Sequence, residues 1–178
     1  MKRIRTDCLL PLVLCLLAIP AHAEKADRDK PIYIESDTAV SDDANKVSTF
    51  TGNAVLTQGT LVIKGAQLVM REDAAGNHYG TATGNPASFR QKRDGVDEYV
   101  EGYAQRIEYD GKVDKLDLFT AARVKRGQDE VKGDHISYDN KTEFFNVNSG
   151  AKDSPSGRVH AVIMPKNKNG AASAPATR

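Results

Sequence analysis

The distribution of hydrophobic residues along the chain predicts short antiparallel β-strands. The stretch 46–70, KVSTFTGNAVLTQGTLVIKGAQLVM, is rich in Val, Thr, Leu, Ile and Phe, residues that suit a pleated and half-buried surface. It is interrupted at 51–53, at 58–59 and at Gly65, where glycine permits turns and bulges. Because no helical i, i+3, i+4 spacing continues across these interruptions, we expect strands joined by turns.

Parts of this stretch recur along the chain. The repeated unit is an apolar residue followed by a charged and a small residue, and its copies are Ile34-Glu35-Ser36, Ile63-Lys64-Gly65, Val100-Glu101-Gly102 and Val131-Lys132-Gly133. Each copy is followed by a turn rich in Asp, Asn and Gly. In the first three copies a second strand then leads to a Thr-centred bend, whereas the fourth copy, which ends at 146–150, has decayed. The copies are 29, 37 and 31 residues apart, which is typical of stacked supersecondary units.

The first 23 residues have the features of a cleaved secretory signal. Residues 1–5 are basic, residues 9–20 form an apolar run of about a dozen residues, and Ala21-His22-Ala23 is a small-x-small cleavage pattern. The run is too short to span a bilayer comfortably. We therefore expect cleavage before Glu24 and secretion without a lipid anchor.

Composition divides the rest of the chain into three parts. Residues 24–30 are charged and residues 166–178 are rich in Lys, Asn, Gly, Ala and Ser, so we expect both segments to be disordered. Residues 31–165 are expected to form one folded domain. At roughly eight residues per strand and turn they predict about 14–16 strands. So many hairpins imply an all-β fold of two antiparallel layers packed face to face, such as a jelly roll or a solenoid sandwich.

Charge and cysteine content exclude two further classes. Without residues 1–23 the chain keeps 22 Lys and Arg against 23 Asp and Glu, so its net charge gives no reason to bind nucleic acid. Both cysteines, Cys8 and Cys15, leave with the signal. The mature chain must therefore be stabilised by burial and strand pairing instead of disulfides.

A search for catalytic or metal-binding residues finds no site. His78, His135 and His160 are not at metal-ligand spacing, and no serine lies in a nucleophile-elbow motif. The carboxylate pairs 42–43 and 129–130 are ordinary turn residues in a meander. The basic cluster 89–93 is a solvated hairpin end or, alternatively, a contact for anionic groups. We expect no catalysis, no metal and no cofactor.

Apolar residues at strand positions define the expected interior. They are Ile32, Ile34, Phe50, Leu56, Leu61, Ile63, Leu68, Met70, Phe89, Ile107, Tyr109, Leu118, Ile136 and Tyr138. With no Trp in the chain, medium-sized aliphatic side chains dominate this set. It could form a tight, dry core or an elongated slot between the layers. A slot would accept acyl chains at about 0.8 kcal/mol per buried CH₂.

The two terminal strands of the domain are predicted to be open sheet edges. The first, 32–35, contributes Ile32, Tyr33 and Ile34, and the last, 158–164, contributes Val159, Ala161 and Ile163. Neither has much of the charge or proline that usually protects an edge, apart from Pro31, Glu35 and Pro165. Two different edges on one molecule pair head to tail and generate open filaments.

Several motifs in the same order resemble the OstA-like family of periplasmic lipopolysaccharide-transport proteins. They are 31–37 (PIYIESD), 50–53 (FTGN), 57–60 (TQGT), 84–89 (GNPASF), 100–102 (VEG) and 131–134 (VKGD), and the similarity extends from about Pro31 to Pro165. Thr120-Ala121-Ala122 departs from the Thr-Gly-Asn expected at the third bend.

The resemblance implies a V-shaped β-jelly roll, open at both ends, whose apolar interior holds the lipid A acyl chains of lipopolysaccharide. It also implies head-to-tail copies that bridge an inner-membrane export complex and an outer-membrane translocon, with no catalytic residues. Two alternatives remain open, namely a secreted β-solenoid enzyme acting on polysaccharide and a purely structural periplasmic filament. The enzyme should show a carboxylate cluster on one sheet face.

Overall fold

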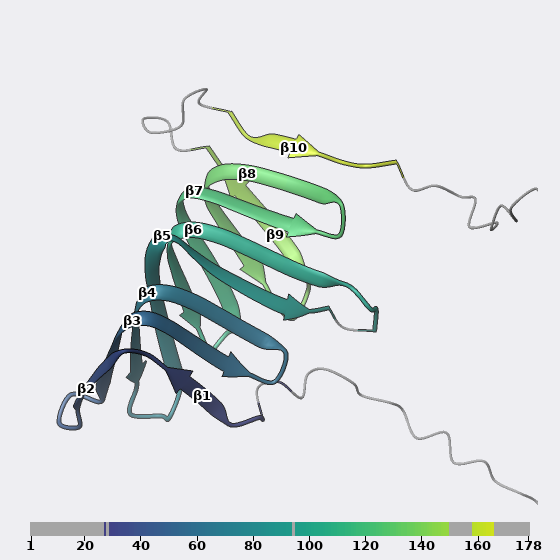
Figure 1. Cartoon of the computed structure of the whole chain (residues 1–178). Coiled ribbons are helices and arrows are strands. Elements are labelled where there is room, and N and C mark those ends of the chain that lie inside the picture. Colours follow the sequence, from purple (N-terminus) through teal and green to yellow (C-terminus); the bar gives the residue numbers. More distant parts are fainter. Residues whose placement is uncertain (1–26, 28, 94, 150–157, 166–178) are drawn as a thin grey trace, which may run out of the picture.

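The computed structural model describes residues 27, 29–93, 95–149 and 158–165, which form one antiparallel sheet of ten strands (Figure 1). The strands are β1 (Ile32–Glu35), β2 (Thr38–Asp42), β3 (Val47–Gln58), β4 (Leu61–Glu72), β5 (His78–Lys92), β6 (Tyr99–Asp110), β7 (Lys115–Arg126), β8 (Asp129–Asp139), β9 (Phe144–Asn148) and β10 (His160–Val162). No helix long and apolar enough to cross a membrane occurs in this part of the chain. The all-β, antiparallel prediction is confirmed.

The sheet grows by hairpins in chain order. The strands from β3 to β8 pair each with the next, so most contacts join neighbours in sequence. At one end β1 and β2 both pair with β3, and at the other β9 and β10 both pair with β8. The sheet therefore stays open, and two short strands lie end to end along each edge.

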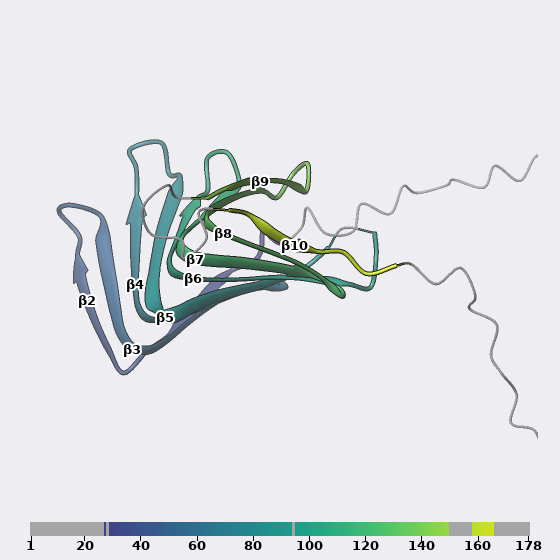
Figure 2. The same ribbon diagram turned by 90° about the horizontal axis from the view of Figure 1, so that it is seen from above.

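A bend at one level folds the long strands into two arms, so that the sheet forms a V when it is seen from above (Figure 2). The register shifts between residues 51 and 54, 64 and 67, 83 and 87, 103 and 106, and 119 and 122. We call arm A the segments 32–35, 54–58, 61–64, 87–92, 99–103, 122–126, 129–133 and 160–162, and arm B the segments 38–42, 47–51, 67–72, 78–83, 106–110, 115–119, 135–139 and 144–148. The V shape that the resemblance implied is thus a folded sheet.

The two expected layers are the arms of this single sheet, and the strand number differs from the prediction. The prediction of 14–16 strands assumed roughly eight residues per strand and turn. In the structure the chain passes through the bend as a bulge, so each strand from β3 to β8 supplies a segment to both arms. The described residues therefore form ten strands, fewer than predicted, because the strands from β3 to β8 are longer than eight residues.

Two left-handed residues form the bend of β3. Gly52 and Asn53 have φ angles of 86° and 45°, and both residues favour this region. The Asp37 side chain fills the space beside Gly52, where a Cβ atom would lie 2.2 Å from its Oδ2. Asp37 also accepts a hydrogen bond from Asn53 Nδ2 at 3.1 Å, and its backbone N–H donates to the Gly52 carbonyl. The link between β1 and β2 is therefore fixed onto the bend of β3.

The bend of β7 has the same backbone geometry without a glycine. Thr120 and Ala121 have φ angles of 65° and 52°. They occupy the places of Gly52 and Asn53, so the departure from Thr-Gly-Asn in the sequence does not change the bend. A β-branched residue in the left-handed region is strained, which makes Thr120 a point of stored backbone energy.

Asp27 contacts the sheet although it lies within the segment 24–30 that we expected to be disordered. It is 9% exposed and accepts hydrogen bonds from Thr60 N at 2.9 Å and from Thr60 Oγ1. It also occupies the space beside Gly59, where a Cβ atom would lie 1.9 Å from its Oδ1. This carboxylate thus stabilises the β3–β4 turn at the tip of arm A. Residues 1–23 and 166–178 lie outside the described part of the chain, and their assignments remain predictions.

Candidate functional site: an apolar interior between two arms

Alternating side chains from both arms point into the V. The cross-strand pairs Ile34–Leu56, Leu56–Ile63, Ile63–Phe89, Phe89–Gly102, Gly102–Val124 and Val124–Val131 form one row across arm A. The matching row across arm B is Phe50–Leu68, Leu68–Ala82, Ala82–Ile107, Ile107–Leu118, Leu118–Ile136 and Ile136–Val147. These rows face each other and form a continuous apolar interior.

Every residue of the predicted interior lies in this cluster. Leu56, Leu61, Ile63, Leu68, Phe89, Ile107, Leu118, Ile136 and Tyr138 are buried, and Ile32, Ile34, Phe50, Met70 and Tyr109 are half-buried and pack against them. Their placement inside the V agrees with the sequence-based expectation. Their contact with lipid stays a prediction.

Sequence reasoning missed the smaller and some larger members of the interior. These are Ala54, Ala82, Ala87, Val100, Ala104, Leu116, Ala122 and Val124, with Phe145 and Val147 packed against them. Each lies two residues from another interior position or next to a bend, so strand alternation could have found most of them. The alanines line the apex, where the arms are too close for larger side chains.

The interior is open toward β1 and closed toward β9. A cavity of about 130 Å³ lies between the arms at the β1 end. Ile32, Leu56, Leu61 and Ile63 line it from arm A, and Met70, Gly80 and Tyr109 line it from arm B. Leu68 and Ile107 extend its floor toward the apex. The part of the cavity lining that comes from these residues is largely apolar.

Aromatic rings join the two arms at the closed end. Phe89 of arm A stacks with Tyr138 of arm B at a centroid distance of 6.2 Å. Tyr138 stacks in turn on Phe145 at 4.4 Å. Phe89 is 1% exposed, so the stack leaves little free space between the arms there.

The basic cluster predicted at 89–93 is divided between the two faces of arm A. Phe89 faces the interior, and Gln91 and Arg93 follow it on the same face. Arg90 faces outward, where its guanidinium lies 3.8 Å from the Tyr99 ring centroid and pairs with Glu101 at 3.5 Å. The basic side chains of this segment therefore do not form one common surface.

Arg93 reaches across the mouth of the V. Its Nη2 lies 2.6 Å from Oε2 of Glu143, in the turn between β8 and β9 at the tip of arm B. Its Nη1 lies 2.7 Å from Oε2 of Glu98, and its backbone N–H donates to the Glu98 carbonyl. The hydrogen bond to Glu143 and the nearby carboxylates raise the pKa of Arg93. Sequence offered no signal for this contact between residues that are 50 positions apart.

His135, which contacts a carboxylate, has a structural role. His135 Nε2 lies 2.9 Å from Asp117 Oδ1, and its ring stacks on Phe119 at 4.6 Å on the outer face of arm B. Burial opposes ionisation of Asp117, but hydrogen bonds from Lys115 and His135 outweigh it and lower the pKa of that carboxyl. No group of three potential metal ligands occurs among residues 27, 29–93, 95–149 and 158–165.

The predicted carboxylate pairs serve local structure. Asp42 accepts hydrogen bonds from the backbone and side chain of Asn45, and these bonds lower the pKa of Asp42. Asp129 accepts a hydrogen bond from the Met164 backbone at 2.9 Å. Glu130 pairs with Lys132 at 2.8 Å, and that hydrogen bond lowers the pKa of Glu130.

Each edge of the sheet offers two strands for pairing. Ile32, Tyr33 and Ile34 lie on β1, and β2 continues the same edge on arm B. At the other edge Ala161 lies on β10 between Val159 and Ile163, and β9 continues the edge on arm B. Tyr33 is 65% exposed and Ile163 is 76% exposed. The predicted edges are therefore present, but sequence reasoning missed the half of each that β2 and β9 supply.

Comparisons with known proteins agree with this architecture. The crystal structure of LptH, the periplasmic LptA homologue of the lipopolysaccharide transport device of Pseudomonas aeruginosa, matches with a TM-score of 0.74 and 28% sequence identity over 79% of this chain and 99% of that one. The lipopolysaccharide export system protein LptA of Escherichia coli K12 is 32% identical over 99% of this chain and 96% of its own length. LptA of Haemophilus influenzae is 32% identical over 93% of this chain and 95% of its own.

A family model supports the same assignment independently. The model described as LptA/(LptD N-terminal domain) LPS transport protein matches residues 33–144, which run from β1 to the start of β9. This range contains both arms, the bends and the open end of the interior. The chain therefore belongs to the LptA/LptD N-terminal-domain family of lipopolysaccharide transport proteins.

Proposed function

We propose that this protein is a non-enzymatic periplasmic carrier that holds lipopolysaccharide by the lipid A acyl chains between its arms. Copies joined edge to edge would bridge the inner-membrane export complex and the outer-membrane translocon. The observation that supports this most directly is the apolar interior, which runs unbroken from β1 to β9 and opens between the arm tips. Membership in a lipopolysaccharide transport family supports the class of cargo.

The size of the cavity determines how binding must proceed. About 130 Å³ is close to the roughly 150 Å³ of an engineered cavity that accommodates one benzene molecule. Several acyl chains require far more room, so the arms must move apart around the bend when the lipid enters. Each methylene buried between the arms contributes about 0.8 kcal/mol, which makes a lipid with several chains able to drive this opening.

Bridging follows from the edges on the two sides of the sheet. The edge of β1 and β2 and the edge of β9 and β10 differ in sequence, so pairing of unlike edges propagates without closing. In such a filament the interiors of successive copies form one continuous apolar groove. The signal predicted at residues 1–23 supports export to the periplasm, between the two membranes.

The polysaccharide-enzyme alternative receives no support from the outer faces. It requires a carboxylate cluster on one sheet face, but Glu101 is paired with Arg90, and Glu130 is paired with Lys132. Both of these carboxylates have a basic partner, and such pairs stabilise the sheet.

The decisive experiment is to purify the periplasmic protein without detergent and to assay it for bound lipopolysaccharide. We expect lipopolysaccharide to co-purify and to be displaced by added lipid A. Intact mass should correspond to a chain that starts at Glu24. A lipid-free protein that also fails to bind added lipopolysaccharide would favour a purely structural filament.

A further inference from the structure

The contact between Arg93 and Glu143 spans the mouth of the V at the closed end. Arg93 Nε lies 3.2 Å and Nη2 lies 2.6 Å from Glu143 Oε2, so the guanidinium binds the carboxylate through two of its nitrogens. The two side chains are 19% and 27% exposed. An arginine–carboxylate pair with several hydrogen bonds and partial burial is among the stronger surface contacts. This pair therefore ties the tips of the two arms together.

A second arginine lies on the same inner face of arm A. Arg126 pairs in register with Val100, which is 1% exposed and faces the interior. Arg126 itself is exposed and makes no ion pair with another described residue. Strand β6 separates β5 from β7, so the backbones that carry Arg93 and Arg126 are about 10 Å apart, two strand spacings.

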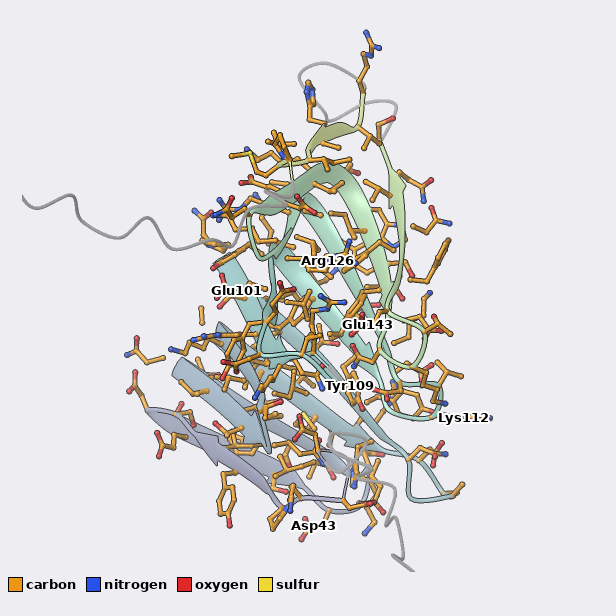
Figure 3. The ribbon with its side chains drawn as sticks, turned by 90° about the vertical axis from the view of Figure 1, so that its right-hand side faces the viewer. Asp43, Glu101, Tyr109, Lys112, Arg126 and Glu143 are labelled. Carbon is orange, nitrogen blue, oxygen red and sulfur yellow. The ribbon has the colours of Figure 1, made fainter. Side chains whose placement is uncertain are left out.

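Figure 3 shows how these charges lie relative to the two arms. From left to right the view passes from Glu101 on the outer face of arm A to Arg126, then to Glu143 and finally to Lys112 at the tip of arm B. Arg126 and Glu143 thus lie on the inner sides of the mouth. Two guanidinium groups lie at the end of an apolar interior. One of them, Arg93, is bound by Glu98 of its own hairpin and by Glu143 of the opposite arm.

From this arrangement we infer that Arg93 and Arg126 form a binding site for a phosphate group on the headgroup of the amphiphile whose chains enter the interior. A phosphate offers guanidinium the same paired oxygen acceptors as a carboxylate, with more negative charge. Glu143 is then the resident counter-anion that the phosphate displaces from Arg93. The inference rests on the proposed function and adds the headgroup site to it.

Displacement of Glu143 links headgroup binding to the opening of the arms. While Arg93 holds Glu143, the arm tips are joined and the rings of Phe89 and Tyr138 remain stacked beneath them. When a phosphate takes the place of the carboxylate, arm B is released at this end. A phosphorylated amphiphile therefore opens the mouth, whereas an uncharged one must break the ion pair without replacement.

The test compares diphosphorylated lipid A with lipid A from which both phosphates have been removed. Dissociation constants of the mature protein for both lipids give a selectivity ratio. We expect the wild type to prefer the phosphorylated lipid by roughly tenfold or more, because a charge-assisted hydrogen bond is lost with each phosphate. R93Q and R126Q should each bring the ratio several-fold closer to one, and R93K should retain part of it.

The variant E143Q distinguishes a phosphate-binding site from an ion pair that only stabilises the fold. Removal of the competing carboxylate should strengthen binding of phosphorylated lipid A, whereas loss of a clasp needed for the fold would weaken it. R90Q is the matched control, since Arg90 lies three residues before Arg93, near the end of β5, and faces outward. Circular dichroism and thermal melting of every variant verify that the sheet is intact.

The outcomes separate the headgroup site from the proposed function. If the wild type binds both lipids equally and R93Q with R126Q leaves the ratio unchanged, the phosphate site is excluded while the carrier function stands. If the wild type binds neither lipid, both are overturned. Addition of millimolar inorganic phosphate should leave the selectivity ratio unchanged. If inorganic phosphate abolishes the selectivity ratio, the two arginines form a site for free phosphate instead.

Discussion

The ring of Phe89 lies directly over the α-carbon of Gly102, its cross-strand partner in arm A. A Cβ atom at Gly102 would be 2.0 Å from Phe89 Cε1 and 2.9 Å from a methyl group of Leu118. Gly102 thus makes room for the largest fully buried side chain of the interior.

Gly102→Ala should destabilise the protein by about 1–3 kcal/mol, because Phe89 must leave its position against tightly packed neighbours. Urea unfolding would measure this change. Gly80→Ala is the matched control, since the closest atom there is the sulfur of Met70 at 3.3 Å, which is part of a flexible side chain. Equal effects of both substitutions would contradict the special role of the Phe89 contact.

Met70→Glu should abolish binding of lipid A without unfolding the sheet. Met70 is half-buried and lines the open cavity, so a carboxylate there would have to be desolvated among acyl chains. Val69→Glu places the same charge on the neighbouring residue, which faces away from the interior, and should leave lipid binding unchanged. Lipid binding by a folded Met70→Glu protein would exclude this cavity as the entry point for acyl chains.

Thr120→Gly should stabilise the protein by about 1 kcal/mol. The substitution relieves the left-handed conformation of a β-branched residue, whose φ is 65°, and this relief exceeds the added entropy of the unfolded chain. Thr81→Gly in a regular part of β5 should do the opposite. Thermal unfolding of the two variants would reveal the difference in sign, and a lower melting temperature for Thr120→Gly would refute strain at this bend.

Stability should fall in acid as the turn carboxylates become protonated. Hydrogen bonds from the side chain and backbone of Asn77, assisted by Tyr79 and Ala75, lower the pKa of Asp73 from 3.8 to about 2. Because the folded-state pKa lies below the unfolded value, the contribution of Asp73 is complete above about pH 4 and is lost as the pH falls toward 2. Urea unfolding from pH 5 to 2 should show a smaller loss for Asp73→Asn than for the wild type. Asp43→Asn, which removes a carboxylate that accepts a single hydrogen bond from Ser41, should follow the wild-type curve.

Deletion of residues 159–178 should leave a folded protein that stays monomeric at concentrations where the full chain assembles. It removes β10 and exposes the arm A segment of β8, where Asp129, Glu130 and Lys132 make a poor replacement edge. Deletion of residues 166–178 retains β10 and should assemble like the full chain. Light scattering over a concentration series would decide between them, and growth of the shorter chain equal to that of the full chain would locate the joint elsewhere.

The bends explain which parts of this structure could be predicted from the sequence. The composition of the strands and the Asp, Asn and Gly turns indicated hairpins and their interior residues, because alternation within one arm follows directly from the pleat. At the bends of β4, β5, β6 and β8 the inward positions change from odd to even or the reverse. On β6, for example, Gly102 and Ala104 face inward before the bend, and Ile107 and Tyr109 do so after it.

Contacts between the arms were beyond sequence reasoning for a different reason. Arg93 and Glu143 have no periodic relationship, and their meeting depends on the angle between the arms, which the bulges set jointly. The pairing of β2 with β3 at the edge likewise depends on the chain crossing the apex after β1. Local patterns specify the pleat, whereas the fold angle is a collective property of several strands.

Since every hairpin from β3 to β8 spans both arms, the protein has a natural unit of growth. Insertion of one hairpin would lengthen the groove by about 9.6 Å, two strand spacings, and leave its cross-section and both terminal edges unchanged. Insertion of one residue within an arm would instead turn all following interior side chains of that segment toward solvent. Duplication or deletion of whole hairpins is therefore the tolerated route to longer or shorter members of this architecture, and the repeats spaced about 30 residues apart in the sequence are what such a history would leave behind.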